Sequence, residues 1–327
     1  MEVTGSRREG LEFKMKNGSM RNYKHWARWG AGWCTYAVRS LSSSHALKPL
    51  VPTFSLVLVV IYGQADRLRN FVAGIFIPQY HYPYPVALCF GQVLVSLLFL
   101  NLLHVLRLVP LKRYSKPLGE RLLLPAICYS VQSVLVMWAK ASSSYAGPFL
   151  FTQPLLAPVT VGLSFALKLK SPPSIHISVL IFILSGTSVV ITASNGISAI
   201  DHLEYLYAPL ALILHSLSLT FLAKVSAAEH RQPLDAQVSV FDLYYTQLVN
   251  QSWVLGLLWL LHPDSPWKVL GQGSWHSLLF HGYLLAILLL GMVLNFLVGI
   301  SALCVSPLAA TLLHSARQVM QPFSHLL

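Results

Sequence analysis

The feature that most constrains the fold is a succession of apolar runs, most of them about 20 residues long, separated by short polar segments. A helix rises about 1.5 Å per residue, so about 20 apolar residues cross a hydrocarbon core about 30 Å thick. Runs this long and continuous favour helices over the alternating strands of a membrane barrel. We therefore predict membrane-spanning helices at residues 85–106, 122–139, 146–167, 175–193, 205–222, 238–261, 278–305 and 306–327.

The first span is less clear than the others. Residues 50–63 are apolar but too few to cross a bilayer unaided, and an apolar run resumes only at residues 71–77. Asp66, Arg67 and Arg69 lie between the two runs. Either the first helix is short and both arginines lie beyond it, or this span has an atypical sequence. Counting it, the chain has about nine predicted spans.

The composition supports a polytopic membrane protein and gives its orientation. Hydrophobic residues make up 55% of the chain and charged residues only 10%, whereas a soluble domain has about 25% charged residues. The net charge of +12 does not indicate nucleic-acid binding, because the basic residues lie in the N-terminal tail and in short loops. The loops after the second, fourth and sixth spans are basic, whereas the opposite loops are not. This pattern predicts a cytosolic N-terminus, with residues 1–48 forming a basic cytosolic tail.

The sequence offers little for catalysis or metal binding. Its four cysteines (Cys34, Cys89, Cys128 and Cys304) have no paired spacing that would indicate disulfides or a metal site. We find no phosphate-binding Gly-rich loop, no His-Glu metal motif and no nucleophile elbow. We therefore predict that the protein is not an enzyme and needs no cofactor.

The last apolar segment contains one full charge, Arg317. It lies about 11 residues, or roughly 16 Å, past the start of the segment at Ser306, near the middle of a bilayer. A charge at that depth normally faces a cavity or an anionic partner, and a guanidinium can hold a phosphate with two parallel hydrogen bonds. The alternative is that Arg317 reaches to an interface. Pro148 and Pro307 each have a threonine four residues on, Thr152 and Thr311, which is a weak internal repeat of the kind that marks carrier binding sites.

Several stretches together resemble a known family. They are HYPYP at 81–85 with CFGQ at 89–92, residues 186–194 with DHLEY at 201–205, DLYYT at 242–246, and the small-residue run with arginine at 306–318. In order and content they resemble the nucleotide-sugar transporters of solute carrier family 35, within the drug/metabolite transporter superfamily. The UDP-sugar branch is the most similar. The resemblance covers roughly residues 70–327.

The resemblance implies ten helices in two inverted five-helix repeats, with both termini cytosolic. Here the first repeat would be 49–193 and the second 194–327, with the tenth helix missing. The implied activity is exchange of a cytosolic nucleotide-sugar for a lumenal nucleoside monophosphate across the Golgi or endoplasmic reticulum membrane. The expected substrate-binding residues are Arg317, Gln318, Thr311, Tyr244, Tyr245 and Gln153, with the tyrosines near the base and Arg317 near the phosphates. Interfacial anchoring is the other interpretation of the two tyrosines.

The chain departs from the family pattern at several points. Many relatives carry Lys or Arg in the fourth helix, six residues after a proline, where this chain has Pro154 preceded by Gln153. Thr246 stands where an asparagine is usual. These departures leave two alternatives open: a membrane scaffold that does not transport, or a carrier of another phosphorylated organic anion. A homodimer is allowed but not required by the sequence.

Overall fold

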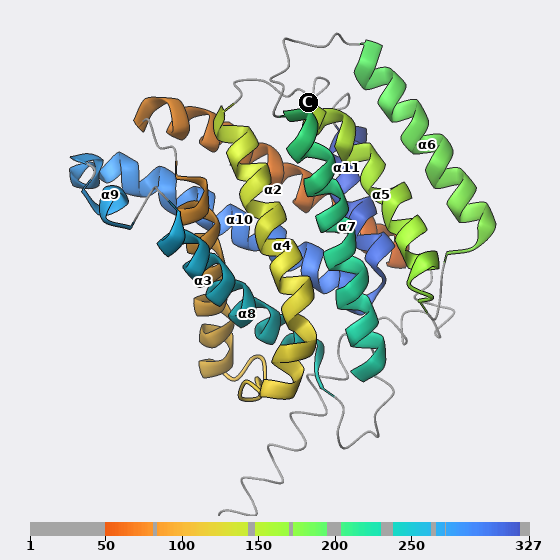
Figure 1. Cartoon of the computed structure of the whole chain (residues 1–327), viewed down its shortest axis with the longest axis horizontal. Helices are drawn as coiled ribbons and strands as arrows, with labels where there is room; N and C mark the ends of the chain where they lie inside the picture. The colour runs from red at the N-terminus through yellow and green to blue at the C-terminus, as the bar shows by residue number, and fades with distance from the viewer. Residues whose placement is uncertain are drawn as a thin grey trace, which may run out of the picture.

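The computed structural model describes residues 50–80, 84–142, 148–169, 173–194, 204–229, 238–262, 266–271 and 273–320, and every regular element within them is a helix (Figure 1). The long helices are α2 (Leu50–Tyr80), α3 (Pro85–Val105), α4 (Lys116–Ser142), α5 (Pro148–Ala166), α6 (Ile175–Ser194), α7 (Glu204–Glu229), α8 (Val240–Leu261), α10 (Leu278–Cys304) and α11 (Pro307–Met320). The short α9 (Pro266–Leu270) and a 3₁₀ turn (Gly273–His276) connect α8 to α10. The predicted tail, residues 1–48, lies outside the described residues.

Each predicted span overlaps one of these helices, and the span predicted at 306–327 is matched by α11 at residues 307–320, with residues 321–327 outside the described part of the chain. Within the described residues, α3, α10 and most of α4 and α7 are long and apolar enough to cross a membrane, judged by length and composition. The all-helical class is therefore confirmed, and the structure is compatible with a multi-pass membrane protein. The division into inverted repeats at 49–193 and 194–327 stays a prediction.

The first helix is continuous through the charged interruption that left two interpretations open. α2 runs without a break from Leu50 to Tyr80. Asp66 is buried and Arg69 is half-buried on its inner face, whereas Arg67 is exposed on the outer face. Neither arginine therefore lies beyond the first helix, and the sequence is atypical because Asp66 and Arg69 face the interior of the bundle while Arg67 faces outward.

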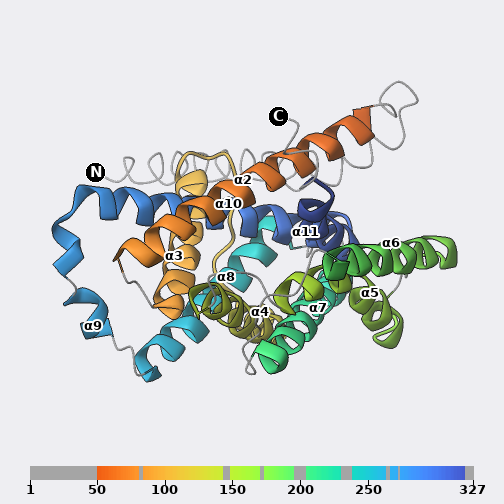
Figure 2. The same cartoon turned by 90° about the horizontal axis from the view of Figure 1, so that it is seen from above.

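The helices form a bundle in which α4 lies at the centre. α4 packs against α7 and α8, α2 packs against α10, and α5 packs against both α6 and α7 (Figures 1 and 2). α6 and α9 lie at opposite ends of the bundle in both views. The outer face of α6 exposes large apolar side chains, among them Leu180, Phe182 and Ile183. In a bilayer such a face contacts lipid, so its exposure needs no protein partner.

Polar contacts close the bundle at the end where α4 begins. Three of them join elements far apart in sequence: Arg121 Nη1 to Glu229 Oε1 at 2.5 Å, the Lys112 amide to Asp242 Oδ1 at 2.7 Å, and Tyr114 hydroxyl to Asn250 Oδ1 at 3.0 Å. Asp242 also forms a capping box with Ser239 at the start of α8. The α3–α4 loop is thereby tied to α8, and α4 is tied to the last turn of α7.

Two glycines let α10 approach its neighbours closely. A Cβ added at Gly291 would lie 2.5 Å from Gln92 Cδ, and one added at Gly299 would lie 2.5 Å from Tyr244 Cε2. Small residues at such positions are typical of packed membrane helices, because they let side chains of the adjacent helix reach the backbone. The close approach of α10 matters for the site, since Asn295 lies between these two glycines.

Replacing Gly299 with alanine should destabilise the fold by about 1–3 kcal/mol, because the buried Tyr244 ring must move to admit the methyl group. Gly282→Ala is the matched control on the same helix, where an added Cβ meets nothing within 4 Å. The control should be neutral or slightly stabilising, because alanine is the better helix former. Thermal unfolding in detergent measures both, and equal melting temperatures for the two variants would contradict the packing described.

Candidate functional site

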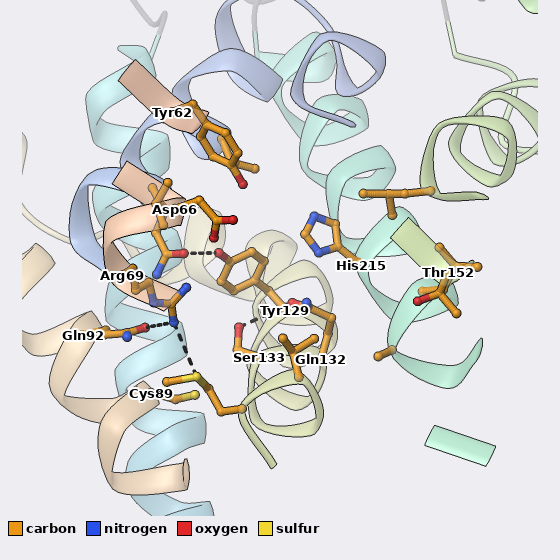
Figure 3. Close-up of a pocket in the computed structure, with 18 residues that line it drawn as sticks. Tyr62, Asp66, Arg69, Cys89, Gln92, Tyr129, Gln132, Ser133, Thr152 and His215 are labelled. Carbon is orange, nitrogen blue, oxygen red and sulfur yellow. Dashed lines mark hydrogen bonds between the residues drawn. The ribbon is translucent and has the colours of Figure 1, made fainter. Parts of the chain in front are cut away.

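The main cavity of the described bundle lies where six helices meet. Its volume is about 110 Å³, and its walls come from α2, α3, α4, α5, α7 and α10 (Figure 3). The apolar part of the wall includes Val136, Met137, Leu156 and Leu294. The polar part consists of Tyr62, Asp66, Arg69, Gln92, Tyr129, Gln132, Ser133, Thr152, His215 and Asn295.

The polar wall residues lie close to the middles of their own helices. Tyr129 is the middle residue of α4, and His215 lies within two residues of the middle of α7. Arg69 and Asn295 each lie four residues, about 6 Å, from the middles of α2 and α10. If these helices cross a bilayer, the cavity lies near its midplane, where binding sites of helical carriers are found.

Arg69 supplies the full positive charge of the described cavity wall. Its Nη2 donates to Gln92 Oε1 at 3.4 Å, which is long for an N–H···O bond, and to Met137 Sδ at 3.5 Å. A guanidinium has five N–H donors, so most of its donor capacity is not used by these two bonds. Gln92 Nε2 is buried and has no hydrogen-bond partner among the described residues. The N–H donors that this corner of the cavity offers to an anion are therefore those of Arg69, because Gln92 Nε2 packs against Gly291.

The rest of the polar wall comes from α2, α4, α7 and α10. Asp66 accepts a hydrogen bond from Asn70 Nδ2 at 3.1 Å, and Tyr129 donates to Asn295 Oδ1 at 2.7 Å. The His215 ring lies 6.0 Å from the Tyr129 ring, centroid to centroid. Figure 3 shows Asp66 and Arg69 on one side of the cavity and His215 on the other. One carboxylate, one guanidinium and one imidazole thus share a single buried space.

A second, much smaller cavity of about 10 Å³ adjoins the first. It shares Tyr129 and Asn295 with the main cavity and adds Tyr244, Gln247 and Gln251 of α8. Those three side chains are buried, and neither Tyr244 hydroxyl nor Gln247 Oε1 has a hydrogen-bond partner in the described part of the chain. The polar surface of the main cavity therefore continues into α8, next to the helix that carries Asn295.

The predicted site residues lie in several places. Tyr244 lines the smaller cavity and packs edge-on against Phe296 at 5.7 Å. Tyr245 is half-buried against the hydrophobic core, and Thr311 is fully buried and donates to the carbonyl of Leu308 at 2.8 Å. Neither Tyr245 nor Thr311 is among the residues that line the two cavities.

The other three predicted residues cannot be placed by their side chains. Arg317 and Gln318 lie on α11, and Gln153 lies on α5 beside the cavity-lining Thr152. Their backbones are helical, but their side chains lie outside the described residues. Their roles therefore remain predictions from the resemblance.

Sequence reasoning missed Arg69 and Asp66 as site residues, although a signal was present. Tyr62, Asp66, Arg69 and Phe76 recur at intervals of three, four and seven residues, which places them on one helical face. The neighbouring Arg67 falls on the opposite face. Treated as a single long helix, the segment would have predicted an inward-facing Asp–Arg pair.

No group of three or more His, Cys, Asp and Glu side chains within the described ranges is placed to hold a metal ion. Comparison of the sequence with protein-family models gives no match, and comparison with curated proteins gives none either.

Proposed function

We propose that the protein is a membrane carrier that exchanges a nucleotide-sugar for a nucleoside monophosphate. The observation that carries this proposal is the half-buried Arg69, which lines a polar cavity near the middles of the helices that form it. A cation that lines a cavity and still has N–H donors to offer suits a phosphate, the group common to both proposed substrates. The sequence resemblance supplies the nucleotide-sugar and the expected setting, a Golgi or endoplasmic reticulum membrane with a cytosolic N-terminus.

Different residues of the cavity wall suit the phosphate, sugar and base of such a substrate. Arg69 would hold phosphate oxygens at one side, where Gln92 Oε1 accepts a hydrogen bond from it and orients it. Gln132, Ser133 and Asn295 offer the hydroxyl and amide groups that hydrogen-bond to sugar hydroxyls or to a base. Tyr244, in the adjoining smaller cavity, is the aromatic residue expected near the base.

The size of the cavity implies that the helices move during transport. Small-molecule sites usually measure about 300–1,000 Å³, whereas this cavity has about 110 Å³. A nucleotide-sugar therefore needs the helices to separate before it binds. Rocking of one half of the bundle against the other is the motion expected of a carrier built from two repeats.

Exchange in proteoliposomes tests this function. Proteoliposomes that contain the purified protein would be preloaded with one nucleoside monophosphate at a time, and labelled nucleotide-sugars would be added outside. We expect uptake that requires a matching monophosphate inside. Arg317→Ala, compared with wild type at equal reconstitution, reports on the α11 arginine separately.

Two results would contradict the proposal. Folded protein that takes up no nucleotide-sugar with any internal monophosphate would favour the non-transporting scaffold. Uptake of other phosphorylated anions without any nucleotide-sugar would favour a carrier of a different substrate.

A further inference from the structure

The charges that line the main cavity do not match the proposed substrate unless protons are added. Arg69 contributes one positive charge and Asp66, one helical turn before it, contributes one negative charge when ionised. His215 is neutral or positive according to pH. With His215 neutral, the described wall therefore has no net charge.

The proposed substrates each carry about two negative charges, on a diphosphate or on a terminal phosphate. Adding such an anion to a cavity of zero net charge would leave about two uncompensated charges at mid-bilayer depth. Uncompensated buried charge is strongly unfavourable. An ionised Asp66 would in addition compete with the phosphate for the field of Arg69, because the two residues lie one turn apart on the same helix face.

We propose that the cavity takes up protons together with the phosphorylated anion, and that Asp66 and His215 are the residues that receive them. This inference rests on the proposed function. A proton on Asp66 removes the competing carboxylate charge, and a proton on His215 adds a positive charge on the opposite wall. Together with Arg69 they would balance an anion of charge about −2. The protons come from the water on the side to which the cavity opens and leave with the anion on the other side.

The surroundings leave these two residues as the natural proton acceptors. On α2 the cavity is faced by Tyr62 and Arg69, on α3 by Cys89 and on α4 by Tyr129. The lining residues from α5 and α10 include no acidic, basic, histidine, cysteine or tyrosine side chain. α11 also packs against α2 and α7, and its described side chains, up to residue 313, include none either. His314 and Arg317 lie farther along α11, outside the described side chains.

Asp66 and His215 are both well buried, with exposures of 8% and 6%. They come from α2 and α7, which lie in the two halves predicted to rock against each other, so movement of the halves would change the environment of both. A buried acid and a buried histidine in one mid-helix cavity are the groups from which proton relays in carriers are built. Anion binding and proton binding would then be linked, and the affinity for the anion would rise as pH falls.

The test is a titration of the whole purified protein in detergent with uridine 5′-monophosphate and, separately, with a UDP-sugar. Calorimetry at pH 7.5 in two buffers of different ionisation enthalpy gives the number of protons taken up per anion bound. We expect between one and two protons per anion. Binding without proton uptake would overturn the coupling and leave the proposed function standing. No binding of either compound would overturn the proposed function and the coupling with it.

Variants assign the protons to residues. Asp66→Asn should bind the anion more tightly than wild type at pH 8 and take up about one proton fewer, and His215→Gln should lower the proton count without tightening binding. Glu120→Gln, an exposed carboxylate on α4, is the matched control and should keep the wild-type count. Circular dichroism checks that each variant is folded. Folded Asp66→Asn and His215→Gln proteins that both keep the wild-type count would refute the assignment.

Discussion

Arg69→Ala is expected to abolish nucleotide-sugar exchange while leaving a folded protein. Arg69 is the one Lys or Arg among the described residues that line the cavity, so its guanidinium carries the full positive charge there. A hydrogen bond to a charged group contributes about 1.5–3 kcal/mol, so loss of a two-bond contact with phosphate removes about 3 kcal/mol or more. That corresponds to a fall in affinity of more than about 100-fold. Initial rates of uptake into proteoliposomes, measured over a range of substrate concentrations, provide the comparison.

Arg67→Ala is the control for this prediction. Arg67 lies two residues away on the same helix but is exposed on the outer face, so its removal should leave uptake near the wild-type rate. Arg69→Lys should be intermediate, because an ammonium keeps the charge but lacks the planar pair of donors. Equal loss in Arg67→Ala and Arg69→Ala would mean that the effect comes from the charge of α2 and not from the cavity. Full activity in Arg69→Ala would remove the observation on which the proposed function rests.

The positions of the helices were predictable because they depend on local properties of the chain. An apolar run of about 20 residues specifies a helix wherever it occurs, and the ends of α3 and α10 fall within one residue of the predicted spans. The extent of α2 was uncertain because its apolar run is not continuous but is interrupted by Asp66 and Arg67. The interruption concerns burial and not helix formation, since charged residues are good or adequate helix formers.

The cavity was not predictable in the same way because it is assembled from positions far apart in sequence. Asp66, Tyr129, His215 and Asn295 come from four helices, and nothing local to any of them indicates that they meet. Asn295 joins α10 to α4 by accepting a hydrogen bond from Tyr129, and it also lines the cavity. The family pattern directed attention to a cation in the fourth span, whereas the cation of the described cavity comes from α2. The three-residue and four-residue intervals that continue across the charged interruption of α2 would have identified this cation as facing the interior.

Separating Arg121 from Glu229 is expected to shift the protein toward a state open at the end where α4 begins. On α4 and α7, the two helices that the ion pair joins, the cavity-lining residues fall at the middle of the helix or in the half away from this end, so on these two helices the ion pair lies between the cavity and the end where α4 begins. The Glu229 side chain is only 5% exposed, whereas that of Arg121 is 56% exposed. The ion pair should therefore stabilise the state in which this end is closed by about 1–2 kcal/mol, a value between those of a surface ion pair and a buried one. Its loss should change the ratio of closed to open molecules by about five- to thirtyfold.

Cys89 provides a native reporter for this shift, because it lines the cavity and is buried in the closed bundle. In a background with the other cysteines replaced by serine, a membrane-impermeant thiol reagent would be applied to one face of sealed vesicles at a time. Arg121→Gln and Glu229→Gln should each speed labelling of Cys89 from the face that carries the α3–α4 loop. The exchanged pair Arg121→Glu with Glu229→Arg should slow it again, since the attraction survives the swap. Faster labelling in the exchanged pair as well would show that side-chain packing, and not the ion pair, holds this end closed.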